Sequence, residues 1–556
     1  MVQKSQKSKS HSKNIKPLKN QKDSKSSQDL RYKDSKSSQD LRYKDSKSSR
    51  DLRYKDSKSS RDLRYKDSKS SRDLKSKDSK GITVKKESDF SEWYTQLLQK
   101  AELIEYSSVS GCYVLRPNAY SIWEKVQQYF DQAIKKEGVK NAYFPLFIPE
   151  SLLSKESKHV QGFTPEVAWV TTTGTTKLSE RLAIRPTSET IMYEAYSKWI
   201  RSHNDLPLKL NQWCNVVRWE FKHPMPLLRS REFLWQEGHT VFASREEAEK
   251  EAYRILDLYE NVYNELYALP VLKGQKSDSE KFAGADFTLS VEIFLPNGKA
   301  VQGATSHHLG QNFSQPFNIT FLDKNQKKQY AWQNSWGITT RSIGIMVLMH
   351  SDNKGLIIPP KVAPIEAVIV PIFFGDLKAQ ILKEAKKIRK SLEKAGLSVH
   401  LDSREGYSPG WKFNEWEVKG VPLRIELGPK DLEKKEVVVV RRDTGEKQSL
   451  PIVSIEKEVE LVLKQVQDDL YKKAESLLRK NIVEVSNLKD AEKSINSGKL
   501  IFAPWCGGTG CEDIFKEKTG AKSINQPFEQ PKMKQGQKCF ACDEEAKHWF
   551  YFGKSY

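Results

Sequence analysis

The chain has 556 residues, which is too long for one hydrophobic core and predicts about three domains at the usual size of roughly 100–200 residues. Charged residues make up 30% of the sequence and the net charge is +21, a balance that suits either a polyanionic partner or a well-solvated surface. Six unevenly placed cysteines exclude a disulfide-stapled secreted fold, and no stretch approaches the roughly 18 apolar residues of a membrane span. We therefore expect a cytoplasmic protein without a membrane segment.

Most of the positive charge lies in an N-terminal tail. Residues 1–80 contain 26 Lys and Arg residues against 11 Asp, which accounts for +15 of the net charge. From Asp23 an 11-residue unit, DSKSSQDLRYK, repeats five times with a partial sixth copy. One Leu and one Tyr per unit cannot offset the entropy of ordering eleven residues, so we predict a disordered basic tail over 1–85. Its charge could contact RNA phosphates, although the Asp residues in every unit favour an inert appendage.

The rest of the chain shows three successive patterns. Helical stretches alternate with strand-like runs such as AYFPLFI and PLKLNQWCNVVRWEF over 86–360, which predicts the largest folded unit. Strands and helices alternate from IEAVIVPIFF to KEVVVVRRD over 361–470, which predicts a small α/β domain. A charged helix around 455–480 then leads into a third unit, 471–556, which holds four of the cysteines.

A predicted antiparallel hairpin in the first unit carries side chains suited to ATP. Arg218 and Glu220 follow its first strand, and Arg229, Arg231 and Phe233 are expected on its second strand, after a polar turn. Arg218 could neutralise the α-phosphate, Glu220 could accept a hydrogen bond from the adenine amine, and Phe233 could stack on the base. Taken alone, the segment is equally consistent with an amphipathic hairpin that bears surface arginines.

Two further segments resolve this ambiguity. GVKNAYFPLFIPESLL around Pro145 precedes the hairpin and GITTRSIGIMVLMHSD around Arg341 follows it. In this order the three segments resemble motifs 1, 2 and 3 of class II aminoacyl-tRNA synthetases. The resemblance implies an α+β catalytic domain with an antiparallel sheet, and a homodimer whose interface includes motif 1. It also implies that ATP binds with Mg²⁺ and that Arg218 and Arg341 stabilise the phosphate charge, because the amino acid's carboxylate attacks the α-phosphorus directly.

Other residues resemble those of prolyl-tRNA synthetases. RPTSET contains Thr187 and Glu189, and QGATSHHLGQNF contains Gln302, Thr305 and His307. The secondary ammonium of proline has two N–H donors, which a hydroxyl and a carboxylate on one face of a strand would satisfy, so we assign Thr187 and Glu189 to proline binding. The resemblance places Gln302 and Thr305 at the ATP and His307 beside the proline.

The pyrrolidine ring of proline needs apolar walls. The resemblance nominates Phe282 in KFAGADF and Trp235 in FLWQEGH, although each could instead be part of an ordinary aromatic core. Threonine is the runner-up substrate. The threonyl enzyme holds its substrate through a pocket zinc, and His239 lies where that enzyme places a ligand, but Cys214 does not match the position of its cysteine ligand. The adjacent His307 and His308 would face opposite sides of a strand, so we expect no metal there.

Only about a hundred residues separate the hairpin from Arg341, which leaves no room for the editing insertion of bacterial prolyl enzymes. This implies the archaeal and eukaryotic type, without hydrolytic editing in cis. The last unit has two close cysteine pairs, and thiolates in this pattern predict a structural Zn²⁺ site in a small α+β domain. The four predicted ligands are Cys506, Cys511, Cys539 and Cys542. The second pair, CFAC, is one residue wider than the CxC common in this type, and the ending FGKSY also resembles the family.

The 361–470 unit resembles the anticodon-binding domain of this subclass. Lys430, Arg441 and Arg442 are candidates for reading the anticodon guanines, and the sequence does not choose among them. The resemblance implies a proline–tRNA ligase that forms prolyl-adenylate from L-proline and ATP and loads the 3′ end of tRNA(Pro). A catalytically inactive relative and a zinc-dependent RNA-binding scaffold are the alternatives. The presence of Arg218, Arg341 and Glu189 favours the enzyme over the inactive relative.

Overall fold

The computed structural model describes residues 81–159 and 166–556, so the repeats of the predicted tail lie outside the described residues. At the start of the described chain, Ile82 and Val84 already pack against the catalytic core. The backbone N–H of Thr83 donates to the Gln96 side chain of helix α2 (Phe90–Lys100) over 3.0 Å. Within the described part of the chain, every helix is too short or too polar to cross a membrane.

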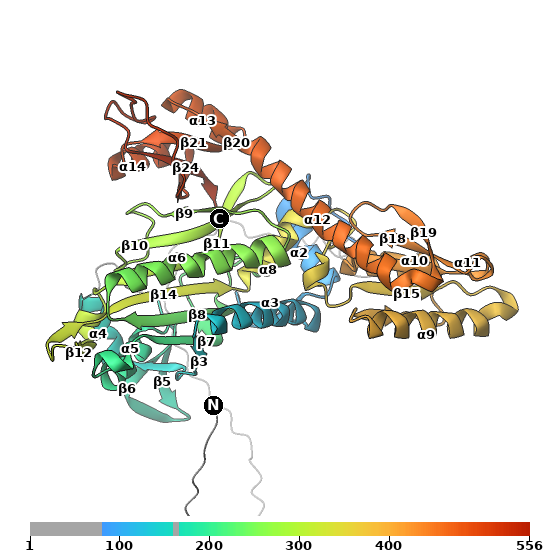
Figure 1. Cartoon of the computed structure of the whole chain (residues 1–556), viewed down its shortest axis with the longest axis horizontal. Coiled ribbons are helices and arrows are strands. Elements are labelled where there is room, and N and C mark those ends of the chain that lie inside the picture. The colour runs from blue at the N-terminus through green and yellow to red at the C-terminus, as the bar shows by residue number, and fades with distance from the viewer. Residues whose placement is uncertain (1–80, 160–165) are drawn as a thin grey trace, which may run out of the picture. The chain divides into compact units, whose positions relative to one another are not determined.

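A large sheet of mainly antiparallel strands carries the catalytic unit (Figure 1). Its order runs through β24 (His548–Ser555), β11, β14, β8 and β7, and β10 also pairs with β11. Helix α6 lies along one face of the sheet and contacts β8, β10, β11 and β14. The bounds of the catalytic elements are β7 (Leu208–Val217), β8 (Glu232–Phe242), α6 (Arg245–Asn261), β10 (Phe287–Phe294), β11 (Lys299–Gly310) and β14 (Trp332–Thr339).

Successive side chains of a strand point to opposite faces of the sheet, so the two faces of β8 contact different surroundings. Gln236 points toward α6 and hydrogen bonds with Tyr259 over 2.7 Å. Trp235 and Glu237 point away from α6 and line a cavity. One face of the sheet is therefore closed by a helix, and the other face is available for a ligand.

Two local predictions were wrong. The run AYFPLFI does not form one strand, since only β4 (Phe147–Pro149) is extended there, paired with β6 (Thr176–Ile184). The hairpin of β7 and β8 is joined by residues 218–231, so Arg229 and Arg231 lie in the connecting loop before β8 begins. The loop is longer than predicted and folds back on itself. Within it the Arg229 N–H donates to the Met225 carbonyl over 2.8 Å.

The second unit is the predicted small α/β domain. Strands β15, β16 and β17 are parallel, and β18 and β19 extend the sheet in antiparallel fashion. Apolar side chains of α9 and α12 form one core with one face of this sheet, and Trp416 of α10 packs on the other face. The bounds are β15 (Ala367–Pro371), α9 (Lys378–Lys394), β16 (Val399–Leu401), α10 (Pro409–Lys419), β17 (Leu423–Leu427), β18 (Glu436–Arg441), β19 (Lys447–Pro451) and α12 (Ile455–Asn481).

The third unit is a small α+β module that is continuous with the second unit through a helix and pairs with the catalytic sheet through a strand. Helix α12 is unbroken across the expected boundary at 470/471, and the boundaries at 85/86 and 360/361 stay predictions. Strand β24 pairs with β21 of the module and, at Lys554 and Ser555, with β11 of the catalytic sheet. The bounds are β20 (Ile482–Glu484), α13 (Leu488–Asn496), β21 (Leu500–Trp505), α14 (Thr509–Thr519), β23 (Gln526–Pro527) and β24 (His548–Ser555).

An ion pair joins the α/β domain to the catalytic helix α8 (Arg341–His350). The guanidinium of Arg442 donates to both carboxylate oxygens of Asp352, just beyond α8, over 3.0 and 2.6 Å, and its Nε donates to the Glu417 carbonyl over 2.9 Å. The Arg442 side chain is only 4% exposed. Arg442 is therefore part of the joint between two domains.

We expect the Arg442→Ala substitution to lower the free energy of unfolding by about 2 kcal/mol, because it removes charge-assisted hydrogen bonds at a buried position. Thermal or urea unfolding measures this change. The control is Arg479→Ala on α12, whose side chain is 76% exposed and pairs with Glu475 along the helix. Such exposed pairs contribute less than about 0.5 kcal/mol. Equal stability of the two variants would contradict the assignment.

Candidate active site and metal centre

A cavity of about 280 Å³ opens on the sheet face opposite α6. It brings together ten of the twelve residues predicted for proline and ATP binding: Thr187, Glu189, Arg218, Phe233, Trp235, Phe282, Gln302, Thr305, His307 and Arg341. The other two, Glu220 and Arg229, lie on the loop 218–231 with exposed side chains and do not line the cavity.

Thr187 and Glu189 form a pair at one end of the cavity, but not on a strand. Strand β6 ends at Ile184, Thr187 lies in the following loop, and Glu189 is the first residue of helix α5 (Glu189–Trp199). The turn into the helix brings the Thr187 hydroxyl against the Glu189 carboxylate, to which it donates a hydrogen bond. The predicted strand geometry was wrong, while the predicted juxtaposition is present.

A second carboxylate at this end, Glu237, was not among the predicted residues. It is 2% exposed and accepts hydrogen bonds from the Ser188 hydroxyl and from Gln212 Nε2 over 3.0 Å, and it contacts His239 Nε2 over 3.1 Å. Burial opposes charge on His239, but the hydrogen bond to Glu237 and the nearby Glu189 outweigh it and raise the pKa of His239. The two-residue period of β8 was the signal that could have found this pair, since Trp235, Glu237 and His239 share one face.

His307 is held as a neutral imidazole between two hydroxyls. Its Nδ1 lies 2.9 Å from Thr288 Oγ1 and its Nε2 lies 2.9 Å from Thr305 Oγ1, so one nitrogen donates and the other accepts. Burial lowers the pKa of His307 to about 3, helped by the charges of His239 and Arg218. The Phe282 ring packs on the imidazole with a centroid separation of 4.7 Å. This wall of the cavity is therefore uncharged at neutral pH.

Two arginines also line the cavity. Arg218 Nε donates to the Pro186 carbonyl over 3.1 Å, and its guanidinium lies 5.7 and 5.4 Å from the ring centroids of Phe233 and Trp235. Arg341 Nε donates to the Leu228 carbonyl over 3.0 Å. Burial and the charge of Arg218 lower the pKa of Arg341, and exposed Arg229 contributes to the same effect. Like charges gathered in this way favour binding of a polyanion.

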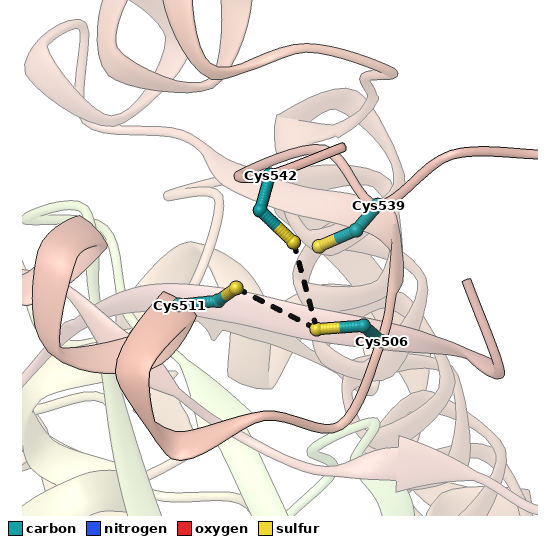
Figure 2. Close-up of side chains that lie close together, drawn as sticks. All are labelled: Cys506, Cys511, Cys539 and Cys542. Carbon is teal, nitrogen blue, oxygen red and sulfur yellow. Dashed lines mark hydrogen bonds between the residues drawn. The ribbon is translucent and has the colours of Figure 1, made fainter. Parts of the chain in front are cut away.

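The four predicted cysteine ligands converge in the C-terminal module, and their sulfurs face one another (Figure 2). All four Sγ atoms lie within 4.8 Å of one another, with Cys506 Sγ at 3.5 Å from Cys511 Sγ and 3.8 Å from Cys542 Sγ. These separations exceed a disulfide bond of about 2.05 Å. They fit four thiolates at about 2.3 Å from one tetrahedral Zn²⁺, which places the sulfurs about 3.8 Å apart.

Two of the three residues that were predicted as candidates for reading the anticodon form ion pairs within the protein. Arg441 donates to Asp443 over 2.7 Å and to Asp469 over 2.8 Å, and Arg442 binds Asp352 as described above. Lys430 is exposed after the carboxyl end of β17. The carboxyl ends of the parallel strands β15 and β16 lie at the same edge of the sheet, where Phe374 is 78% and Tyr407 46% exposed. The Tyr407 ring stacks on Trp411 at a centroid distance of 4.0 Å.

Comparison with known proteins agrees with this architecture. Residues 170–350 match the family described as tRNA synthetase class II core domain (G, H, P, S and T), and 366–461 match the anticodon binding domain. Residues 488–556 match the family described as Prolyl-tRNA synthetase, C-terminal. The catalytic unit is thus a class II aminoacyl-tRNA synthetase core, as predicted.

Several curated relatives are similar over most of this chain. The chain is 50% identical over 483 residues to the cytoplasmic proline–tRNA ligase of Arabidopsis thaliana, covering 86% of this chain and 91% of that protein. It is 48% identical to a putative proline–tRNA ligase of Saccharomyces cerevisiae, covering 86% of this chain and 73% of the relative. It is also 48% identical to proline–tRNA ligase 2 of Bacillus cereus, covering 85% of this chain and 98% of the relative. The chain belongs to the prolyl-tRNA synthetase family, which confirms the predicted family.

Proposed function

We propose that this protein is a proline–tRNA ligase, which condenses L-proline with ATP to prolyl-adenylate and then loads the 3′ end of tRNA(Pro). The observation that carries the proposal is that one cavity is lined both by the Thr187–Glu189 pair and by Arg218 and Arg341. The first pair suits a secondary ammonium and the second suits a polyphosphate. The names of the relatives support the substrate.

In this proposal Thr187 and Glu189 each accept one N–H of the proline ammonium, which leaves the carboxylate directed toward Arg218. A proline carboxylate oxygen attacks the α-phosphorus, a new P–O bond forms, and pyrophosphate leaves with the electrons of the broken bond. Arg218 neutralises the charge that builds at the α-phosphate, and Arg341 holds the γ-phosphate. The catalytic contribution of the protein is positioning and charge stabilisation, so the reaction needs no nucleophilic side chain.

The side walls of the cavity would fix the ring of proline and the base of ATP. Trp235 and Phe282 enclose the pyrrolidine ring, and neutral His307 adds an uncharged contact. Phe233 stacks on adenine, while Gln302 and Thr305 bind the ribose side of the nucleotide. We assign Glu220 and Arg229 to ATP as well, from the loop above the cavity.

Class II synthetases use ATP with Mg²⁺. The carboxylates of this cavity are already engaged, since Glu189 accepts from Thr187, Glu237 accepts from Ser188, and Glu280 pairs with Lys522. In the described part of the chain, the cysteine cluster is the single group of three or more residues arranged to hold a metal. We propose that Mg²⁺ binds the ATP phosphates, from which it would withdraw charge.

Three further features belong to the proposal. Exposed apolar residues around motif 1, namely Tyr143 at 72% and Phe147 at 44%, suit the interface of a homodimer. We also propose that the chain does not edit mischarged tRNA in cis, because only about a hundred residues separate the β7–β8 hairpin from Arg341. We also propose a cytoplasmic location, as in the name of the Arabidopsis relative.

ATP–pyrophosphate exchange with single amino acids tests the activation step. We expect exchange with proline, a loss of about 10²–10³-fold in kcat for Arg218→Ala, and a raised KM for proline in Glu189→Gln. Glu194→Gln is the matched control, because Glu194 lies on the same helix with a side chain 46% exposed. Exchange with threonine but not with proline would refute the substrate.

We propose that Cys506, Cys511, Cys539 and Cys542 bind one structural Zn²⁺. Elemental analysis of the purified protein should give about one zinc per chain, and a chelator should lower its melting temperature, because a structural metal contributes to folding. The Cys539→Ser variant should lose the metal, whereas Cys112→Ser, outside the cluster, should retain it. Metal-free protein with normal stability would refute the site.

We propose that the exposed rings at the carboxyl edge of the α/β sheet stack on anticodon bases, with Lys430 beside them. The Tyr407→Ala variant should raise the KM for tRNA about tenfold or more, because stacking on an aromatic ring contributes about 1–3 kcal/mol per base. Exchange measured without tRNA should not change. Tyr330→Ala, another exposed tyrosine, is the control. An unchanged KM for tRNA in Tyr407→Ala would exclude this surface.

A further inference from the structure

We infer that the C-terminal module positions one wall of the active site and that Glu512 is the residue through which it does so. The wall in question is the loop 276–286, here called the wall loop, which connects β9 (Leu272–Gln275) to β10. The inference rests on the proposed function, since two residues of the wall loop, Glu280 and Phe282, line the proposed substrate cavity.

Glu512 lies near the start of α14 and its side chain points into the wall loop. The residue is 4% exposed. Ser279 Oγ donates to Glu512 Oε2 over 2.5 Å, and the Ser523 hydroxyl donates to Oε1. Ser277 Oγ lies 3.5 Å from the same Oε1 and 2.8 Å from Ser523 Oγ. A buried carboxylate must be satisfied by hydrogen bonds, and here two of its three partners belong to the wall loop.

Other contacts attach the wall loop, and strand β9 before it, to the C-terminal module. Lys276 Nζ, which is buried, donates to the Ile524 carbonyl over 2.8 Å and pairs with Glu292 of β10 over 2.7 Å. Lys522 pairs with Glu280. The backbone contact is equally close, because strand β23 pairs with β9 and a Cβ on Gly274 would lie 2.1 Å from the Gln526 carbonyl oxygen.

The turn of the wall loop depends on Ser277. The Ser277 carbonyl accepts the N–H groups of Glu280 over 3.1 Å and Lys281 over 2.9 Å. A displacement of Ser277 therefore shifts the backbone that leads directly to Phe282. Phe282 packs on His307, so this shift would also move the wall of the cavity at the proposed proline site. A shift of about 1 Å at such a position is enough to lower activity by about 10²-fold.

Glu512 also links the wall loop to the cysteine cluster, because it follows Cys511 directly on α14. The position of Cys511 in a closed four-thiolate site fixes the first turn of this helix. Glu512 is thus a positioning residue, and its environment connects the proposed metal site to the amino-acid pocket.

The test compares Glu512→Gln with Glu517→Gln, an exposed glutamate on the same helix. In the full-length protein, Glu512→Gln should raise the KM for proline about tenfold or more and leave the KM for ATP near its original value. Hydrogen exchange of residues 276–286, measured by mass spectrometry without substrates, should become faster. Zinc content and melting temperature separate this effect from unfolding or metal loss, and Ser279→Ala should give no further increase when combined with Glu512→Gln.

Exchange of the wall loop and KM values equal to those of Glu517→Gln would overturn the inference. Loop exchange is measured in the free protein and does not depend on the substrate. If the original protein fails to activate proline, the proposed function fails, and faster loop exchange in Glu512→Gln still supports the positioning role. A further variant, Ser279→Ala alone, should reproduce the faster exchange without altering α14.

Discussion

The active site depends on one buried carboxylate, that of Glu237. A charge in the protein interior is tolerated only when its lone pairs are satisfied, and Glu237 takes its partners from three elements: Ser188 before α5, Gln212 of β7 and His239 of β8. Burial raises the pKa of Glu237, but these hydrogen bonds and the His239 charge outweigh it, so the net pKa is lowered. The requirement to satisfy this carboxylate fixes the start of α5 against the sheet, and hence the position of Glu189.

The same constraint recurs at the boundaries between the units. The buried Arg442 is satisfied by Asp352 at the exit of α8, and Glu512 is satisfied in part by serines of the catalytic unit. Strand β24 adds a backbone contribution, because its last residues pair with β11. The α/β domain and the C-terminal module are therefore each attached through a buried charged group, Arg442 or Glu512, that needs a partner. Hydrogen bonds of this kind fix the orientation of each unit relative to the catalytic unit. A fixed orientation suits a protein whose units bind one RNA, since the anticodon and the 3′ end belong to the same molecule.

Much of this architecture follows from local patterns. The apolar run after Arg341 forms α8, the alternating segments after Ile365 form the α/β domain, and the spacing of the cysteine pairs brings four thiols together. The strand assigned to RPTSET was wrong, because Ser188 and Glu189 begin a helix whose first turn is held by the distant Glu237. Arg441 and Arg442 were predicted as candidates for RNA contact. Arg441 pairs with the neighbouring Asp443 but also with Asp469, 28 residues away, and Arg442 pairs with Asp352, 90 residues away.

The sequence by itself determined the family, the order of the units and ten of the residues that line the cavity, because these depend on residue type and on spacing along the chain. The tertiary structure alone decided how Thr187 meets Glu189, that Glu237 contacts both Ser188 and His239, and that Glu512 reaches the wall loop. The physical reason is that a buried polar group takes whichever partner the fold brings within about 3 Å, and that partner lies at no fixed distance in sequence.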